Sequence, residues 1–153
     1  FFFSKRNPKK CPNLEITAVD MRTIKPLSLK NIPERLQSKI SINYNRGNVL
    51  KDPMHDIIRS YAPFDLILSD LAPKTAGNYK DIAIQISMVK KVLSYIDSFL
   101  TQKGNAVVKV YETPELPSLI KEYEMRFKMV KATKPQASKQ RSKEKYIIGK
   151  WKY

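Results

Sequence analysis

The sequence predicts an α/β protein built on a doubly wound, mainly parallel sheet. Residues 64–70 are predicted to form a strand with a nearly continuous apolar core, which is typical of a strand covered on both faces, and residues 105–110 form a second one. Between them, apolar residues recur at helical spacing over residues 80–102. A strand, a long helix and a second buried strand in this order indicate a crossover unit of a parallel sheet.

The rest of the chain continues this alternation of strands and helices. Asp52 is expected to be the N-cap of a short helix, with Pro53 at its first position, and Gly104 is expected to end the long helix. The other predicted elements are strands at 14–19, 40–44, 126–132 and 145–151, helices at 54–61 and 114–123, a connection with a short helical piece at 22–39, and a polar loop at 133–144.

The composition restricts the kind of protein and its partners. The chain has 153 residues, with 29 Lys and Arg against 14 Asp and Glu, and a net charge of +15. Such an excess on one domain indicates a polyanionic partner, usually nucleic acid; the alternative is a solvated surface in a lysine-rich protein. No apolar run approaches the roughly 18 residues that a membrane span needs. The single cysteine, Cys11, cannot form an internal disulfide, and Cys11 with His55 is too little for a zinc site.

Three charged residues stand out from their surroundings. Asp70 closes the apolar strand 64–70, Lys109 interrupts the apolar strand 105–110, and Glu144 is the only acid among ten basic residues between Arg126 and Tyr153. Each has a structural alternative, namely a turn cap for Asp70, a snorkelling edge lysine for Lys109 and a surface ion pair for Glu144. Ligands of doubly wound sheets bind beyond the carboxyl ends of the strands, so Asp70 and Lys109 are candidate site residues.

The motifs around these residues resemble the FtsJ family of S-adenosylmethionine-dependent RNA ribose 2′-O-methyltransferases. They are Asp70-Leu71-Ala72-Pro73, Val107-Val108-Lys109-Val110 and the segment 134–146, which reads KPQASKQRSKEKY. Lys139 stands where the family usually has arginine. The resemblance runs from about Ile16 to Gly149. It implies a Rossmann-like methyltransferase sheet with a C-terminal antiparallel strand pair, S-adenosyl-L-methionine as cofactor, and RNA as substrate. Ribosomal RNA is the first choice, and transfer RNA and the mRNA cap are alternatives.

The resemblance also implies roles for the three charged residues. Asp70, Lys109 and Glu144 match the last three members of the family's Lys-Asp-Lys-Glu catalytic tetrad, and the first lysine has no counterpart here. Lys109 would be the base or the group that steers the ribose hydroxyl, Asp70 would orient Lys109, and Glu144 would hold the lysine and the hydroxyl in register. A lysine serves as a base only if its pKa falls towards neutrality, which a neighbouring cation and partial desolvation would favour. The scheme requires no metal.

Further residues are implied to bind the cofactor and the RNA. Asp20 matches the family's acidic residue near the cofactor's nucleoside, Asn48 stands where an aspartate borders the adenine, and Asp70 would also lie near the methionine end. Lys134, Lys139, Arg141 and Lys143 are expected to meet phosphates. Tyr79, Tyr111 and Trp151 are candidates for stacking on bases, with packing inside the protein as the alternative.

One departure from the family concerns the start of the chain. The family's glycine-rich cofactor loop is missing, together with the first, central strand that precedes it. Residues 1–13 are therefore expected to be a basic lead-in segment, and 14–153 a methyltransferase domain without its N-terminal cofactor-loop portion, with about 50 or more residues upstream in the whole protein. This departure motivates an alternative, a non-catalytic RNA-binding ribosome-assembly factor. A monomer or a part of a ribonucleoprotein assembly is expected, without a membrane partner; cytoplasm, nucleolus and mitochondrion fit equally.

Overall fold

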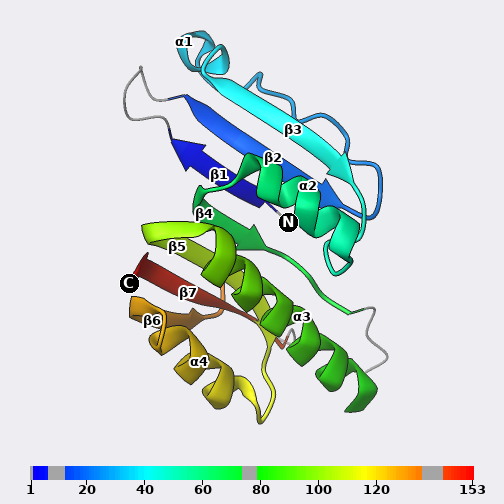
Figure 1. The fold of residues 1–153 in the computed structure, drawn as a ribbon, viewed down its shortest axis with the longest axis vertical. Helices are drawn as coiled ribbons and strands as arrows, with labels where there is room; N and C mark the ends of the chain where they lie inside the picture. The colour runs from blue at the N-terminus through cyan, green and yellow to red at the C-terminus, as the bar shows by residue number, and fades with distance from the viewer. Residues whose placement is uncertain (1, 7–12, 74–78, 136–142) are drawn as a thin grey trace.

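A computed structural model describes residues 2–6, 13–73, 79–135 and 143–153 of the chain. The strands form one seven-stranded sheet in the order β3-β2-β1-β4-β5-β7-β6 (Figure 1). The strands are β1 (Phe2–Arg6), β2 (Leu14–Asp20), β3 (Ile40–Arg46), β4 (Phe64–Ser69), β5 (Leu100–Tyr111), β6 (Phe127–Thr133) and β7 (Glu144–Lys152). The helices are α1 (Glu34–Gln37), α2 (Asp52–Tyr61), α3 (Tyr79–Phe99) and α4 (Leu116–Glu124). No helix among these described residues is both long and apolar enough to cross a membrane.

The strand directions place the ends of four strands at one edge of the sheet. β2 pairs with β3 in parallel and β4 pairs with β5 in parallel, whereas β7 runs antiparallel to both β5 and β6. Since β1 is antiparallel to both β2 and β4, those two strands point the same way. The carboxyl ends of β2, β3, β4 and β5 therefore lie along a single edge, where ligands of such sheets bind. The C-terminal antiparallel pair predicted for the sheet is β6 and β7.

The centre of the sheet differs from expectation. Among the described residues, the central position between β2 and β4, where a parallel strand was expected, is occupied by β1, which runs in the opposite direction. Phe2 pairs with Ala18 on one side and with Leu68 on the other, so β1 satisfies the backbone groups that a gap would have exposed. The prediction of a lead-in loop over residues 1–13 is therefore wrong for residues 2–6. A short connection from β1 to β2 permits only an antiparallel pair, since a parallel one needs a crossover of a dozen or more residues.

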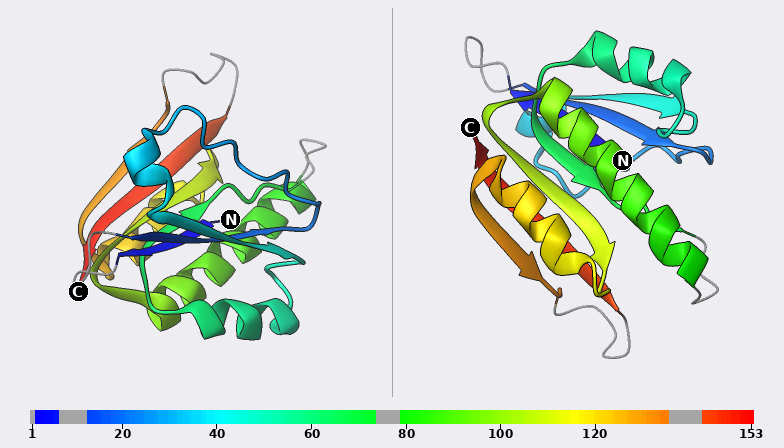
Figure 2. Two further views of the ribbon diagram at one scale, coloured as in Figure 1. Left: turned by 90° about the horizontal axis from the view of Figure 1, so that it is seen from above. Right: turned by 60° about the horizontal axis from the view of Figure 1, so that its bottom comes forward.

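The three longer helices cover one face of the sheet. Figure 2 shows α2, α3 and α4 together on one side, with α1 and its connecting segment on the other. Along β5, Val108 and Val110 are buried in the core with Ile96 of α3, while Val107 and Lys109 point to the opposite, partly exposed face. This strict alternation follows from the two-residue period of a strand. It decides that Lys109 lies on the face without the long helices.

Two helix boundaries in the structure differ from those predicted from the sequence. The long helix ends at Phe99 instead of continuing to residue 102, because Leu100 already pairs with Phe64 in the sheet. Gly104 consequently lies inside β5, where a Cβ atom would come within 2.8 Å of the Leu100 side chain and the Thr101 carbonyl oxygen. Asp52 is the first residue of α2 and Lys51 is its N-cap, with no side-chain hydrogen bond, so the prediction of an Asp52 cap is wrong.

Candidate active site

The strand register brings the three predicted charged residues together. Ser69 of β4 is paired with Val108 of β5, so Asp70, the next residue, lies beside Lys109. On the other side of β5, Lys109 is paired with Tyr146, two residues after Glu144 at the start of β7. Three segments that are far apart in the sequence thus converge at one edge of the sheet.

The three side chains form an ion-pair cluster, here called the catalytic trio (Asp70, Lys109 and Glu144) after the roles predicted for them from the sequence. The Nζ atom of Lys109 lies 2.9 Å from Oδ1 of Asp70 and 3.4 Å from Oε1 of Glu144. The Lys109 side chain is only 11% exposed, whereas that of Asp70 is 67% exposed. The ammonium group is therefore fixed at the base of the site, with a carboxylate beside it that is open to solvent. Lys109 is neither a snorkelling edge residue nor unpaired.

Tyr146 adds a fourth group, to which the sequence analysis assigned no role. Its hydroxyl donates a hydrogen bond of 3.4 Å to Oδ1 of Asp70, the same oxygen that binds Lys109. Burial, followed by the charge of Asp70, raises the pKa of Tyr146, so the hydroxyl keeps its proton. The signal in the sequence was the Glu-x-Tyr spacing, since residues two apart in a strand share a face. Tyr146 can hold Asp70 in place against Lys109.

The pKa of Lys109 is shifted away from the direction that a lysine base would need. Burial by itself would lower it, but hydrogen bonds and charge from Asp70 and Glu144 outweigh burial and raise the pKa above its ordinary value of 10.5. Since two carboxylates face the ammonium group, the charged form is favoured. In this arrangement Lys109 is a cation that donates hydrogen bonds, which suits the role of steering a hydroxyl better than the role of a base.

The two predicted nucleoside-binding residues lie at the ends of neighbouring strands. Asp20 ends β2, and its backbone oxygen accepts a hydrogen bond from the backbone N–H of Gly47 at 2.9 Å. This contact brings the Asn48 segment next to Asp20. Oδ1 of Asp20 accepts the backbone N–H of Arg22 at 2.7 Å, and Oδ1 of Asn48 accepts that of Leu50 at 3.0 Å. Both side chains therefore also stabilise their own turns.

These residues fit one half of the cofactor that a methyltransferase fold implies. The Asp20 side chain is 41% exposed at a strand end, where a carboxylate can accept hydrogen bonds from the hydroxyls of a ribose. Asn48 offers an amide, which can both donate and accept hydrogen bonds at a base edge. Asp70 lies on the same edge of the sheet, towards the catalytic trio. The described residues thus supply partners for a nucleoside, and no glycine-rich turn is found among them.

The predicted RNA contacts are described in part. Lys134 and Lys143 are exposed, and both charges act on Glu112, which forms an ion pair with Lys145. The backbone N–H of Glu112 donates to the oxygen of Lys143 at 2.8 Å, so this lysine lies close to the end of β5 and the catalytic trio. Lys139 and Arg141 lie outside the described residues, as does the side chain of Tyr79. Tyr111 is half-buried, whereas Trp151 is 46% exposed.

Comparison with known proteins agrees with this architecture. The chain is 32% identical over 106 residues to the ribosomal RNA large subunit methyltransferase E of Borrelia garinii subsp. bavariensis, covering 69% of the chain and 55% of that protein. The protein of the same name from Archaeoglobus fulgidus is 31% identical over 137 residues, covering 88% and 65%. The chain thus spans a little over half the length of the first of these relatives.

A solved structure shares the fold. A ribosomal RNA methyltransferase from Plasmodium falciparum superposes with a TM-score of 0.69 at 19% identity, covering 89% of this chain and 71% of that one. The sequence model of the FtsJ-like methyltransferases matches residues 3–152. With a match over nearly its whole length, the chain belongs to the FtsJ-like methyltransferase family.

Proposed function

We propose that the protein transfers a methyl group from S-adenosyl-L-methionine to a ribose 2′-hydroxyl of RNA, with ribosomal RNA as the substrate. The observation that carries this proposal is the catalytic trio, in which a nearly buried ammonium group is held between two carboxylates at the ligand-binding edge of the sheet. The relatives named above are both described as ribosomal RNA methyltransferases, which favours an enzyme over an assembly factor. The net charge of +15 suits a polyanionic substrate.

In this proposal Lys109 steers the hydroxyl. A protonated amine has three donors, and Asp70 and Glu144 accept two of them, which leaves one direction for the 2′-oxygen. Holding the oxygen at a fixed distance and angle removes much of the entropic barrier of a two-molecule reaction. Tyr146 and Asp70 fix the direction in which Nζ points.

In this proposal a carboxylate accepts the proton of the hydroxyl. As the oxygen forms its new bond, its proton becomes strongly acidic, so a weak base placed within hydrogen-bond reach can accept it. Glu144 is suited to this step because its Oε1 atom already lies 3.4 Å from the lysine that holds the oxygen. Lys109 would take over as the base only if an added positive charge lowered its pKa.

The cofactor would be held at the same edge of the sheet. Asp20 and Asn48 would bind its nucleoside, and Asp70 would lie near its methionine end. When bound, the cofactor supplies an activated methyl group. The chain's own contribution is then to orient the hydroxyl, to accept its proton and to keep both groups at the ends of neighbouring strands.

Methyl transfer tests this proposal. The whole protein is incubated with methyl-labelled S-adenosyl-L-methionine and unmodified ribosomal RNA, and the labelled nucleoside is identified by mass spectrometry. A 2′-O-methyl nucleoside is the expected product. Lys109→Ala should reduce the rate by at least about 100-fold, since it removes the group that orients the hydroxyl.

A matched lysine controls for loss of charge. Lys90 is exposed on α3, on the other face of the sheet from the catalytic trio, and Lys90→Ala should transfer methyl groups at the rate of the unchanged protein. Label in a base instead of a ribose would contradict the proposed reaction. Equal rates for Lys109→Ala and Lys90→Ala would contradict the role of the trio.

A further inference from the structure

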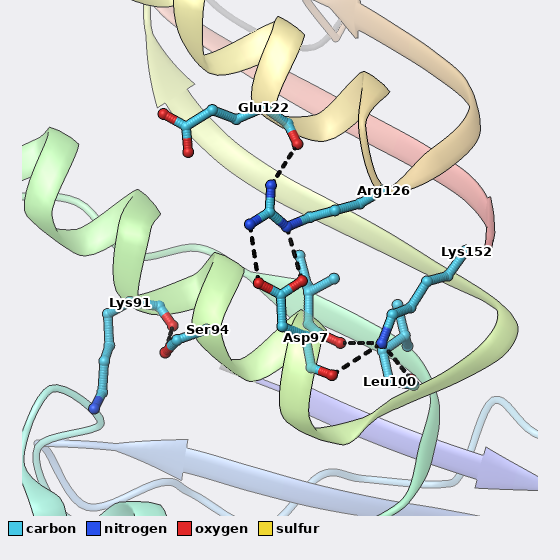
Figure 3. A network of polar contacts seen from close by, with 8 residues as sticks. Lys91, Ser94, Asp97, Leu100, Glu122, Arg126 and Lys152 are labelled. Atoms are coloured by element: carbon cyan, nitrogen blue, oxygen red, sulfur yellow. Dashed lines mark hydrogen bonds and ion pairs between the residues drawn. The ribbon is translucent and has the colours of Figure 1, made fainter.

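The far end of β7 is anchored to α3 by one lysine. Nζ of Lys152 donates hydrogen bonds to three backbone oxygens at the carboxyl end of α3, those of Ile96 at 2.7 Å, Asp97 at 3.1 Å and Leu100 at 2.9 Å (Figure 3). The last carbonyl groups of a helix have no partner within the helix, and a cation there is favoured by the helix dipole. Lys152 is thus held in place, half-buried, immediately after Trp151.

A second contact closes the same end of the sheet. The guanidinium of Arg126 binds both carboxylate oxygens of Asp97, at 2.7 and 2.9 Å, and donates to the backbone oxygen of Glu122 at 2.7 Å (Figure 3). The backbone oxygen of Arg126 in turn accepts the N–H of Tyr153 at 3.1 Å. The residues before and after Lys152 are therefore presented from a fixed backbone.

Trp151 is turned outward on this backbone. Its backbone φ angle is 58°, which residues other than glycine rarely adopt. Its backbone N–H donates a hydrogen bond to Oδ1 of Asn105 at 3.2 Å. The side chain is 46% exposed, and that of Tyr153 is 62% exposed. A strained backbone that presents a large aromatic ring to solvent is more typical of a binding site than of a core.

The register of the strands places three exposed lysines near this tryptophan. Lys150 directly precedes Trp151 in β7. Lys128 of β6 lies opposite Trp151, because its neighbours Phe127 and Met129 are paired with Lys152 and Lys150. Lys103 lies two residues before Asn105, the residue that accepts the hydrogen bond from Trp151. Residues 100–106, 127–133 and 145–153 contain no acid, so these strands place only positive charge at this end of the sheet. We call Trp151, Tyr153, Lys103, Lys128 and Lys150 the Trp151 patch.

We propose that the Trp151 patch binds single-stranded RNA, with a base stacked on Trp151 and the lysines against the flanking phosphates. Aromatic rings bordered by cations are the shared chemistry of single-strand binding, because every base has a face to stack and every linkage has a charge. At about 3.3 Å per residue, Trp151 lies about 23 Å along β7 from Glu144. The patch would thus hold a part of the RNA remote from the ribose that reacts. The proposal deepens the proposed function, since it rests on RNA as the substrate.

The tryptophan emission of the protein, excited selectively, reports on this patch alone, because Trp151 is its only tryptophan. The full chain is titrated with a 12-nucleotide oligouridylate, and both tryptophan emission and the anisotropy of a labelled oligonucleotide are followed. We expect the emission to be quenched in step with binding. Trp151→Ala should weaken binding by about 5- to 100-fold, whereas Trp151→Phe, which keeps a ring, should weaken it less. Met125→Ala, which truncates an apolar side chain that is 69% exposed, should bind like the unchanged protein.

Two further measurements separate stacking from simple charge. Lys150→Gln should reduce the slope of log affinity against log salt by about 0.7, the value for one contact to a single strand. An RNA duplex of the same length should bind without quenching Trp151, because its bases are already stacked. Equal quenching by the duplex or by polyglutamate would overturn the proposal, and so would RNA binding with unchanged emission and unchanged affinity of Trp151→Ala.

The test does not depend on catalysis. Lys109→Ala should still quench on RNA addition, so a protein without methyl transfer would leave this inference standing. A protein that transfers methyl groups but shows no quenching would leave the proposed function standing and overturn the inference.

Discussion

Replacing Lys152 by methionine removes one ammonium group and keeps the length of the side chain. Three backbone oxygens at the end of α3 would then lose their shared donor, while the aliphatic part of the side chain would still pack in place. The change therefore isolates the hydrogen bonds and the charge from the burial of apolar surface.

The size of the effect follows from the contacts. A hydrogen bond that involves a charged group contributes about 1.5 to 3 kcal/mol, so three of them at the lower bound contribute about 4.5 kcal/mol. Ordering a lysine side chain costs up to about 2 kcal/mol, and burial also lowers the pKa of Lys152, so part of the gain is offset. We expect Lys152→Met to lower the free energy of unfolding by about 2 to 3 kcal/mol.

Urea denaturation followed by far-ultraviolet circular dichroism measures this difference. Lys150→Met is the matched control, since Lys150 is exposed on the same strand and should change the free energy of unfolding by less than about 0.5 kcal/mol. Emission of Trp151 gives a second, local signal next to the substitution. If the two variants lose the same stability, the three carbonyl contacts do not stabilise the fold and the reasoning is refuted.

Three other substitutions test the packing and the electrostatics of the same sheet. Gly149→Ala should lower the free energy of unfolding by about 1 to 3 kcal/mol in urea denaturation, because its Cβ atom would come within 2.6 Å of the buried ring of Phe127; an unchanged midpoint would contradict this. The pKa of Lys109 is raised in the folded protein above its ordinary value of 10.5. The stabilisation by the trio is therefore fully present below pH 10.5 and is lost as the pH rises through the higher pKa of the folded state. The unfolding free-energy difference between the unchanged protein and Lys109→Met should therefore be constant near neutral pH and shrink in strong alkali; a difference that grew with alkali would contradict it. Tyr146→Phe, which removes the hydrogen bond to Asp70, should slow methyl transfer by about 5- to 10-fold with little change in RNA affinity, and an unchanged rate would remove Tyr146 from the site.

The sequence was sufficient for the strands and helices that depend on local pattern. The apolar stretch of β4 and the helical spacing of α3 predicted both elements, and the order of elements placed Asp70 and Lys109 at one edge of the sheet. The end of α3 could not be predicted, because the pairing of Leu100 with Phe64 is a contact between distant residues that overrides helix propensity.

The electrostatics of the site could not be predicted from the sequence, because they depend on which charged side chains the fold brings together. A lysine between two carboxylates and a lysine beside a cation look alike in a sequence, yet their pKa values shift in opposite directions. The raised pKa of Lys109 depends on the register that seats both Asp70 and Glu144 within 3.4 Å of it. The strand β1 was missed for a similar reason, since a short basic segment becomes a strand only where two others leave a place for it.

That strand also has a mechanical consequence. β1 is five residues long and joins two parts of the sheet. On one side lie β2 and β3, which lead to Asp20 and Asn48, and on the other lie β4, β5 and β7, which carry the catalytic trio at their ends. In the proposed function, the pairing of this strand with β2 and β4 would therefore set the distance between the bound nucleoside and the reacting hydroxyl. A slip of one residue in that pairing would displace one part against the other by about 3.3 Å, more than the length of a hydrogen bond. The short strand β1 would thus determine the spacing between the cofactor-binding residues and the catalytic trio in the proposed reaction.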